Sequence, residues 1–171
     1  MLFWIFTFCA LRLCVVQAEF DIVFEDVDCT DINEEYVKTC EFELNYDSTY
    51  GSSVNTYLEF IKPLPEDIKL QADVFTVRMG EYNVDVGLHL DADFCEIAQG
   101  EKSIAVPILR AVNMDGQNCP PKPGVYQREG FVIDSMDGLP TSFPGGHYLL
   151  NMTLLSKDTK IVHFDVYVRV Y

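Results

Sequence analysis

The chain has 171 residues, which suits one domain, and apolar residues make up 49% of it. Its 27 acidic residues against 12 basic ones give a formal net charge of −15. With no basic stripe to offset it, this charge disfavours binding to nucleic acid, or to an anionic membrane by charge alone. The apolar fraction also excludes a disordered acidic tail.

The first eighteen residues, MLFWIFTFCALRLCVVQA, form an almost wholly apolar run that ends in the small-residue pattern Val16-Gln17-Ala18. This ending is typical of a signal-peptidase site, and the run is short for a membrane span. Because Arg12 interrupts the run and no positive region precedes it, an N-terminal anchor or a buried helix is the alternative. We expect a signal peptide over 1–18 and a secreted, soluble domain over 19–171.

Four cysteines remain after the expected cleavage site: Cys29, Cys40, Cys95 and Cys119. An even number of cysteines in an exported chain predicts two disulfides, for which three pairings are possible. Free buried thiols or a metal site are the alternatives, but there is no C-x-x-C motif and the histidines lie far from the cysteines in sequence. We therefore expect no metal and no other cofactor.

Apolar and polar residues alternate along much of the chain, which predicts half-buried β-strands. The alternation is clearest over 82–90 and recurs over 42–46, 148–154 and 162–170. Segments rich in proline, glycine and charged residues separate these stretches. Several short strands with regular turns predict an antiparallel β-sandwich or barrel.

Residues 68–79 also alternate, but the apolar positions change phase within the segment. The inward residues are expected to be Ile68, Leu70 and Ala72, followed by Phe75, Val77 and Met79. Such a change predicts a β-bulge near Asp73.

The segment 101–112 departs from the strand pattern. Its residues Ile104, Ile108 and Val112 recur at helical spacing, and Pro107 would kink or shorten a helix. We expect one short helical segment there, lying over the sandwich.

The sequence Asn151-Met-Thr153 is an acceptor site for N-glycosylation. In the alternation of 148–154, Asn151 lies opposite the apolar Leu150 and Met152, so its side chain should face solvent. We expect a glycan on Asn151 in a secreted chain, and an unused site is the alternative.

No catalytic motif stands out. Three histidines, His89, His147 and His163, occur without a G-x-S-x-G nucleophile motif. Asp91 and Asp93 are close together but lack the loop spacing of an EF-hand. We expect that the protein is not an enzyme.

The interior of a sandwich with one short helix can itself be a binding site. An apolar ligand held between the sheets is stabilised by removal of its surface from water, at about 25 cal/mol per Å². A filled core is the ordinary alternative. The residues expected to line such a cavity are Phe75, Val77, Val86, Leu88, Leu90, Phe94, Ile104, Ile108, Phe131 and Ile133.

The order of motifs over about 93–150 resembles that of one known family. The motifs are Asp93-Phe-Cys-Glu96, the helical segment, Asn118-Cys-Pro120, Pro123-Gly-Val-Tyr126 and Leu139-Pro-Thr-Ser-Phe-Pro-Gly-Gly-His-Tyr148. This order is similar to that of the ML lipid-recognition proteins, in particular the ganglioside-activator-like branch and the secreted insect proteins of the CheB chemosensory type. The N-terminal half matches that branch only in its strand pattern and its early cysteine.

The resemblance implies an all-β, immunoglobulin-like antiparallel sandwich whose interior apolar cavity binds a lipid or another hydrophobic small ligand in chemosensation or pheromone response. It implies a disulfide between Cys95 and Cys119, which leaves Cys29 and Cys40 as the second pair. The activator branch ties its early cysteine to the last strand, whereas 161–171 holds no cysteine. Transient membrane contact fits this role. The alternative function is a secreted acidic protein–protein interaction module with a filled core.

Overall fold

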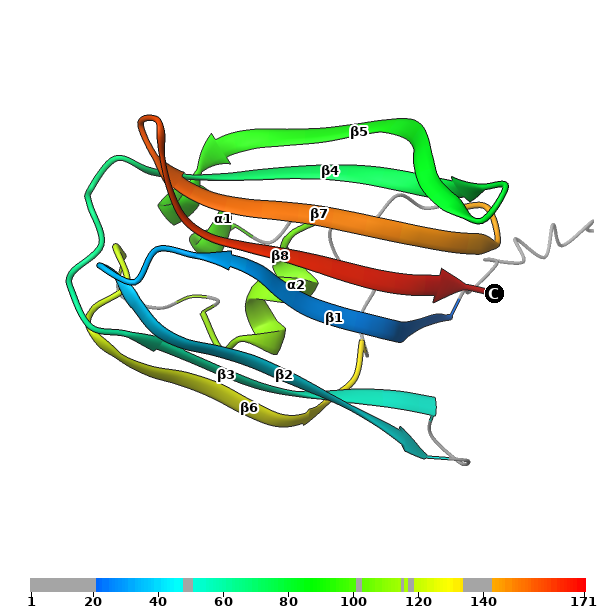
Figure 1. Ribbon diagram of the computed structural model, residues 1–171, viewed down its shortest axis with the longest axis horizontal. Coiled ribbons are helices and arrows are strands. Elements are labelled where there is room, and N and C mark those ends of the chain that lie inside the picture. Colours follow the sequence, from blue (N-terminus) through cyan, green and yellow to red (C-terminus); the bar gives the residue numbers. More distant parts are fainter. Residues whose placement is uncertain (1–20, 48–50, 101–102, 115, 117–118, 134–142) are drawn as a thin grey trace, which may run out of the picture.

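The computed structural model describes residues 21–47, 51–100, 103–114, 116, 119–133 and 143–171. These residues form an antiparallel β-sandwich with two short helices (Figure 1), which confirms the predicted all-β fold class. The strands are β1 (Ile22–Ile32), β2 (Val37–Asp47), β3 (Gly51–Phe60), β4 (Ile68–Arg78), β5 (Glu81–Asp93), β6 (Gly124–Phe131), β7 (Gly146–Ser156) and β8 (Thr159–Val170). The helices are α1 (Phe94–Gln99) and α2 (Val106–Ala111).

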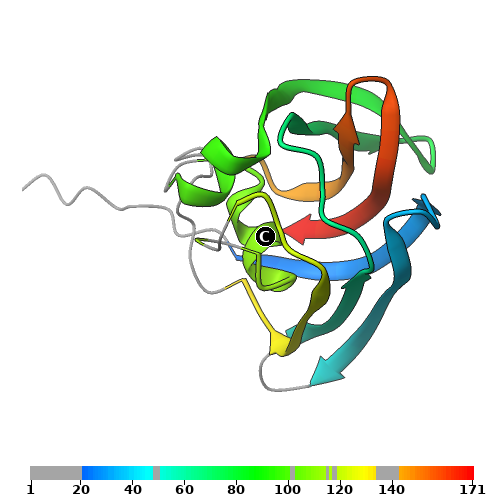
Figure 2. The same ribbon diagram turned by 90° about the vertical axis from the view of Figure 1, so that its left-hand side faces the viewer.

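The two sheets meet at one edge and separate at the other. One sheet has five strands in the order β1-β8-β7-β4-β5, and the other has three in the order β2-β3-β6. At the closed edge β1 lies against β2, and a disulfide between Cys29 and Cys40 joins these strands. At the open edge, between β5 and β6, the helices fill the space between the sheets (Figure 2). The helical segment therefore occupies the side on which the interior would otherwise be exposed.

The alternating stretches identified in the sequence correspond to β2, β4, β5, β7 and β8. The alternation did not reveal β1 and β3. In β1 a register shift between Phe24 and Asp26 interrupts the pattern. In β3 the buried set includes the polar residues Ser52 and Thr56, which hides the contrast between its two faces.

The predicted change of phase in β4 is wrong. Val74 is 2% exposed and continues the inward set of Ile68, whereas Val77 and Met79 are 36% and 94% exposed. A bulge near Asp73 is present, but its extra residues belong to β5. Asp73 pairs with His89 and Phe75 pairs with Asp85, so a step of two residues along β4 is matched by a step of four along β5. Strand β4 thus stays in phase while its partner carries the irregularity.

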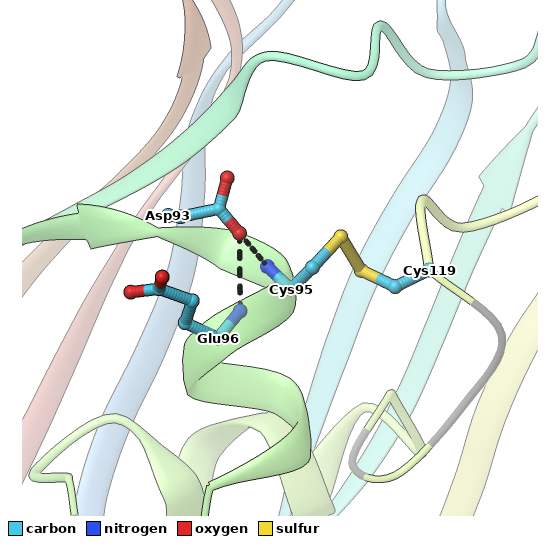
Figure 3. The surroundings of a disulfide bond; sticks show 4 residues. All are labelled: Asp93, Cys95, Glu96 and Cys119. Atoms are coloured by element: carbon cyan, nitrogen blue, oxygen red, sulfur yellow. Dashed lines mark hydrogen bonds between the residues drawn. A yellow bond between two sulfur atoms is a disulfide. The ribbon is translucent and has the colours of Figure 1, made fainter.

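The helical region contains two helices where one was predicted over 101–112. Helix α2 is confined to Val106–Ala111, and Pro107 lies in its first turn, where the missing N–H breaks no intrahelical hydrogen bond. Helix α1 begins directly after β5. Its cap is Asp93, whose Oδ1 accepts hydrogen bonds from the backbone N–H groups of Cys95 (2.8 Å) and Glu96 (3.0 Å) (Figure 3).

The second disulfide joins α1 to the chain that leads into β6. It connects Cys95 with Cys119 across a sequence separation of 24 residues (Figure 3). Both disulfide pairings expected from the resemblance are therefore confirmed. The bond fixes one end of the helical region at the open edge of the sandwich.

The expected signal peptide at 1–18 lies outside the described residues. Within the part of the chain that the structure describes, no helix has the length and apolar character needed to cross a bilayer.

Candidate ligand-binding cavity

One half of the sandwich interior is filled by its own side chains. Phe60 of β3 and Phe94 of α1 are among the largest fully buried residues there. The space left between these rings, Leu70 and Phe164 is only about 10 Å³. This half is an ordinary close-packed core with no room for a ligand.

The other half contains an apolar cavity of about 40 Å³. It lies between the inner face of the five-stranded sheet and the segment that carries α2. Its walls come from β1, β4, β5, β7 and β8 on one side and from residues 104–108, 133 and 143 on the other. The lining residues are Ile22, Val74, Leu88, Ile104, Pro107, Ile108, Ile133, Phe143, Tyr148, Leu150, Val168 and Val170.

Helix α2 forms a fixed wall of this cavity because its C-terminal end is anchored to the three-stranded sheet. The hydroxyl of Thr56 in β3 donates a hydrogen bond to the carbonyl oxygen of Ala111 (2.7 Å). Nη1 of Arg128 in β6 donates to the carbonyl oxygen of Arg110 (2.8 Å). The first bond satisfies a carbonyl at the end of the helix. The second adds a side-chain donor to a carbonyl that also accepts a hydrogen bond from the backbone N–H of Asn113 (3.1 Å). With this end held, Pro107 and Ile108 face the five-stranded sheet across the cavity.

Tyr148 presents a ring rather than a polar group to the cavity. Its hydroxyl donates a hydrogen bond to the carbonyl oxygen of Pro144 (2.8 Å). The ring meets Phe143 edge-on, with centroids 4.6 Å apart. Burial raises the pKa of the Tyr148 phenol, so the residue is neutral at physiological pH. The cavity therefore offers apolar surface almost throughout, which suits a hydrocarbon group.

A groove of about 400 Å³ lies beside the cavity, between the edge strand β5 and helix α1. Leu88 and Ile104 line both the groove and the cavity, so the two spaces adjoin at these side chains. The groove opens to solvent at the open edge of the sandwich. It is lined by Leu88, His89, Leu90, Ala92, Glu96, Ile97, Gly100, Ser103 and Ile104.

The structure brings together only part of the predicted lining set. Leu88, Ile104, Ile108 and Ile133 line the cavity, and Leu90 lines the groove.

The remaining predicted lining residues lie elsewhere. Phe94 fills the packed half of the interior, Phe131 packs against Phe24 in the core, and Val86 packs at the core margin. Phe75 and Val77 were expected to point inward and do not. They lie opposite to the buried Val74 in the β4 alternation, on the outer face of the sheet.

Other lining residues were not named from the sequence, although their strands were recognised. Tyr148 and Leu150 belong to the alternation of 148–154, and Val168 and Val170 to that of 162–170. The signal that they point inward was present. Which inward residues border a cavity depends on where the helices fill the interior, and the alternation carries no information about that.

Asn151 of the glycosylation motif lies on the outer face of β7, the central strand of the larger sheet. It is half-buried, and its Nδ2 donates a hydrogen bond to Oδ1 of Asp165 on β8 (2.9 Å). Among the described residues, no group of three or more histidine, cysteine, aspartate or glutamate side chains is placed to bind a metal ion.

The sequence matches no protein-family model and no curated protein. Among solved structures, the fold is similar to that of chicken MD-1, which was crystallised in complex with lipid IVa. The sequences are 13% identical, the TM-score is 0.41, and the match covers 90% of this chain and 98% of that chain. A similarity this distant establishes neither a family nor a ligand for the protein.

Proposed function

We propose that the protein is a secreted, non-enzymatic binding protein for a lipid or another hydrophobic small ligand. The observation that supports this proposal is the apolar cavity of about 40 Å³, adjoined by an open groove. Protein interiors are close-packed, so an apolar space that reaches the surface is a candidate binding site.

The free energy of binding would come from burial of hydrocarbon. Each methylene removed from water contributes about 0.8 kcal/mol. A cavity of about 40 Å³ accommodates only a small group, so a longer chain must widen it or extend into the groove. The lining residues Leu88, Ile104 and Ile133 are half-buried and lie at the margin, where movement disrupts the least packing.

The same proposal includes the location of the protein and its biological role. A signal peptide over 1–18 would direct export, and two disulfides are typical of an oxidising compartment. The motif order over 93–150 supports an ML-like domain of the CheB type, and with it a role in chemosensation or pheromone response. Ligand exchange by transient contact of the apolar groove with a membrane fits this role.

A pair of neighbouring substitutions in β7 tests the proposal. Leu150 lines the cavity, whereas Leu149 precedes it in the strand alternation and points to the outer face. Leu150→Phe adds a ring to the cavity and should weaken the binding of a neutral hydrophobic fluorophore by about tenfold or more. Leu149→Phe makes the same chemical change on the outer face and should leave binding unchanged.

The measurements are fluorophore titration and native mass spectrometry of the secreted protein. If neither the fluorophore nor any co-purifying hydrophobic molecule binds the unmodified protein, the carrier proposal fails. A secreted acidic interaction module would then be the remaining candidate. Equal loss of binding in both variants would show that the fluorophore does not bind in the cavity.

A further inference from the structure

Strand β3 places two hydroxyl groups in the interior of the sandwich, and only one of them has a partner. Ser52 is 7% exposed and Thr56 is 4% exposed, and no other polar residue that the structure describes is buried. The Thr56 hydroxyl donates to the carbonyl oxygen of Ala111. Oγ of Ser52 has no hydrogen-bond partner among the described residues. Because a buried polar group left unpaired is costly and rare, the Ser52 hydroxyl points to a partner from outside the chain.

Ser52 faces the interior at the end of the sandwich that holds the apolar cavity. The ladder between β3 and β6 pairs Val54 with Phe131, and both residues are buried. Two residues further on, the inward positions are Ser52 on β3 and Ile133 just beyond the end of β6. Ile133 lines the cavity. The hydroxyl therefore lies beside a wall of the cavity.

Strand β1 gives the same placement from another side. A Cβ atom on Gly51 would lie 3.5 Å from Cγ1 of Val23, so the start of β3 contacts the start of β1. The residue before Val23 is Ile22, which lines the cavity together with its cross-strand partner Val170. Ser52 thus follows a residue that touches β1 at the level of the cavity.

A ligand can reach this hydroxyl if it displaces one side chain. The cavity of about 40 Å³ must widen for a longer ligand, and Ile133 is a half-buried residue outside the regular strands. Movement of Ile133 makes room toward Ser52, where the wall changes from apolar to polar. A serine hydroxyl donates one hydrogen bond and accepts others. An oxygen atom of the ligand at this point would supply the bond that the chain itself does not make.

From this arrangement we propose that the ligand carries a neutral oxygen group, such as a hydroxyl, ketone or ester, and that the Ser52 hydroxyl forms a hydrogen bond with it. The inference rests on the proposed function, because the hydrocarbon part of the ligand is held in the cavity. A plain hydrocarbon would leave the Ser52 hydroxyl unpaired. An ionised head group would lose its hydration for one neutral hydrogen bond, which does not offset the cost of burying a charge.

Two neighbouring serines on β3 provide matched variants. Ser52→Ala removes the inward hydroxyl, and Ser53→Ala makes the same chemical change on the outer face of the strand. Octanol and octane, which differ by one oxygen atom, would each compete with a neutral hydrophobic fluorophore for the secreted protein. Ser52→Ala should lower the ratio of octanol to octane affinity about three- to tenfold, as expected for the loss of one hydrogen bond. Ser53→Ala should preserve the ratio.

The stability of the ligand-free protein separates recognition from a structural role. The Ser52 hydroxyl has no bond to lose there, so Ser52→Ala should leave the urea midpoint of unfolding unchanged or raise it. A lower midpoint for Ser52→Ala than for Ser53→Ala would show that the inward hydroxyl is bonded within the protein. That result would overturn the inference.

The outcomes of the binding experiment distinguish the inference from the proposed function. If Ser52→Ala leaves the ratio of octanol to octane affinity unchanged, the hydroxyl does not recognise the ligand. If both serine variants lower the ratio equally, the effect is not specific to the interior. In either case the inference is wrong and the carrier function stands. If neither octanol nor octane binds the unmodified protein, the proposed function itself fails.

Discussion

Thr56 in β3 and Ala111 at the end of α2 are 55 residues apart in sequence, yet the threonine hydroxyl lies 2.7 Å from the alanine carbonyl oxygen. Thr56 is 4% exposed, so this bond is shielded from water. It joins the helix that walls the cavity to the smaller sheet. One of the two polar residues that obscure the alternation of β3 therefore helps to position the helix.

Thr56→Val should destabilise the protein by about 1–2 kcal/mol, because it keeps the shape of the side chain and leaves the buried carbonyl of Ala111 without this partner. Urea denaturation measures the change. Thr159→Val, at the exposed start of β8, is the control and should change stability little. An unchanged unfolding midpoint for Thr56→Val would show that α2 is held without this bond.

The disulfides allow a comparison between the two edges of the sandwich. Replacing Cys95 and Cys119 together by serine should lower the free energy of unfolding by about 3 kcal/mol, because a loop with a separation of 24 residues is no longer closed in the unfolded chain. Replacing Cys29 and Cys40, with a separation of 11, should cause a similar or slightly smaller loss.

Only the first of these changes should affect ligand binding. Cys95 lies in α1, which borders the groove, whereas the other bond joins β1 to β2 at the closed edge. Fluorophore titration under conditions in which both variants remain folded measures this difference. Equal effects on binding would contradict a site at the open edge.

The fold class could be predicted from the sequence because alternation directly reports which residues of a strand face the core. The alternation of 82–90 also concealed a bulge in β5. Between Asp73–His89 and Phe75–Asp85, β5 contains two extra residues, and an insertion of two leaves the alternation unchanged. Gly87, with a φ of 78°, lies within this insertion. No sequence pattern of period two can reveal such a bulge.

A second irregularity in β5 turns the side chains of its first residues to the opposite face of the sheet. The pairing shifts again between Thr76 and Val77, and Tyr82 meets Tyr167 with ring centroids 5.2 Å apart. Tyr167 alternates with the buried Val166 and Val168, so this contact lies on the outer face. At this end of the sheet an aromatic pair therefore packs on the outer face, and Val77 is 36% exposed. Apolar character alone does not identify the inner face there, and this is the assumption by which Phe75 and Val77 were predicted to point inward.

The candidate site was harder to predict than the fold because it depends on what fills the interior. Leu88 and Phe94 are both apolar residues near the end of β5. Phe94 packs into the filled half of the sandwich, whereas Leu88 borders the cavity. The difference arises from the position of the helices relative to the sheets, which is a long-range property.

Asn151 should carry an N-linked glycan in the secreted protein. Its side chain lies on the outer face of the central strand, away from the cavity, so a glycan there does not obstruct the groove. Intact mass before and after glycosidase treatment should show the loss of one glycan, and Asn151→Gln should abolish the difference. An unmodified mass in the secreted protein would contradict the expectation. In that case the bond from Asn151 to Asp165 is the main role of the side chain.

The pH dependence of stability should contain a contribution from His89. The pKa of His89 is raised from its ordinary value of 6.5, chiefly by the hydrogen bond to Asp73 and then by the charge of Asp85. The folded state therefore holds the proton more tightly than the unfolded chain. This stabilising contribution is complete below about pH 6.5 and is lost as the pH rises through the raised pKa of the folded state.

Titration of the His89 ring by NMR should give a midpoint above 6.5, and Asp73→Asn should move the midpoint down by removing the largest cause. The free energy of unfolding of the unmodified protein, relative to His89→Gln, should be greatest below about pH 6.5 and should decline at higher pH. Since the ring is exposed to solvent, high salt should weaken the charge contribution of Asp85. A midpoint at or below 6.5 would show that the Asp73–His89–Asp85 arrangement is not maintained in solution.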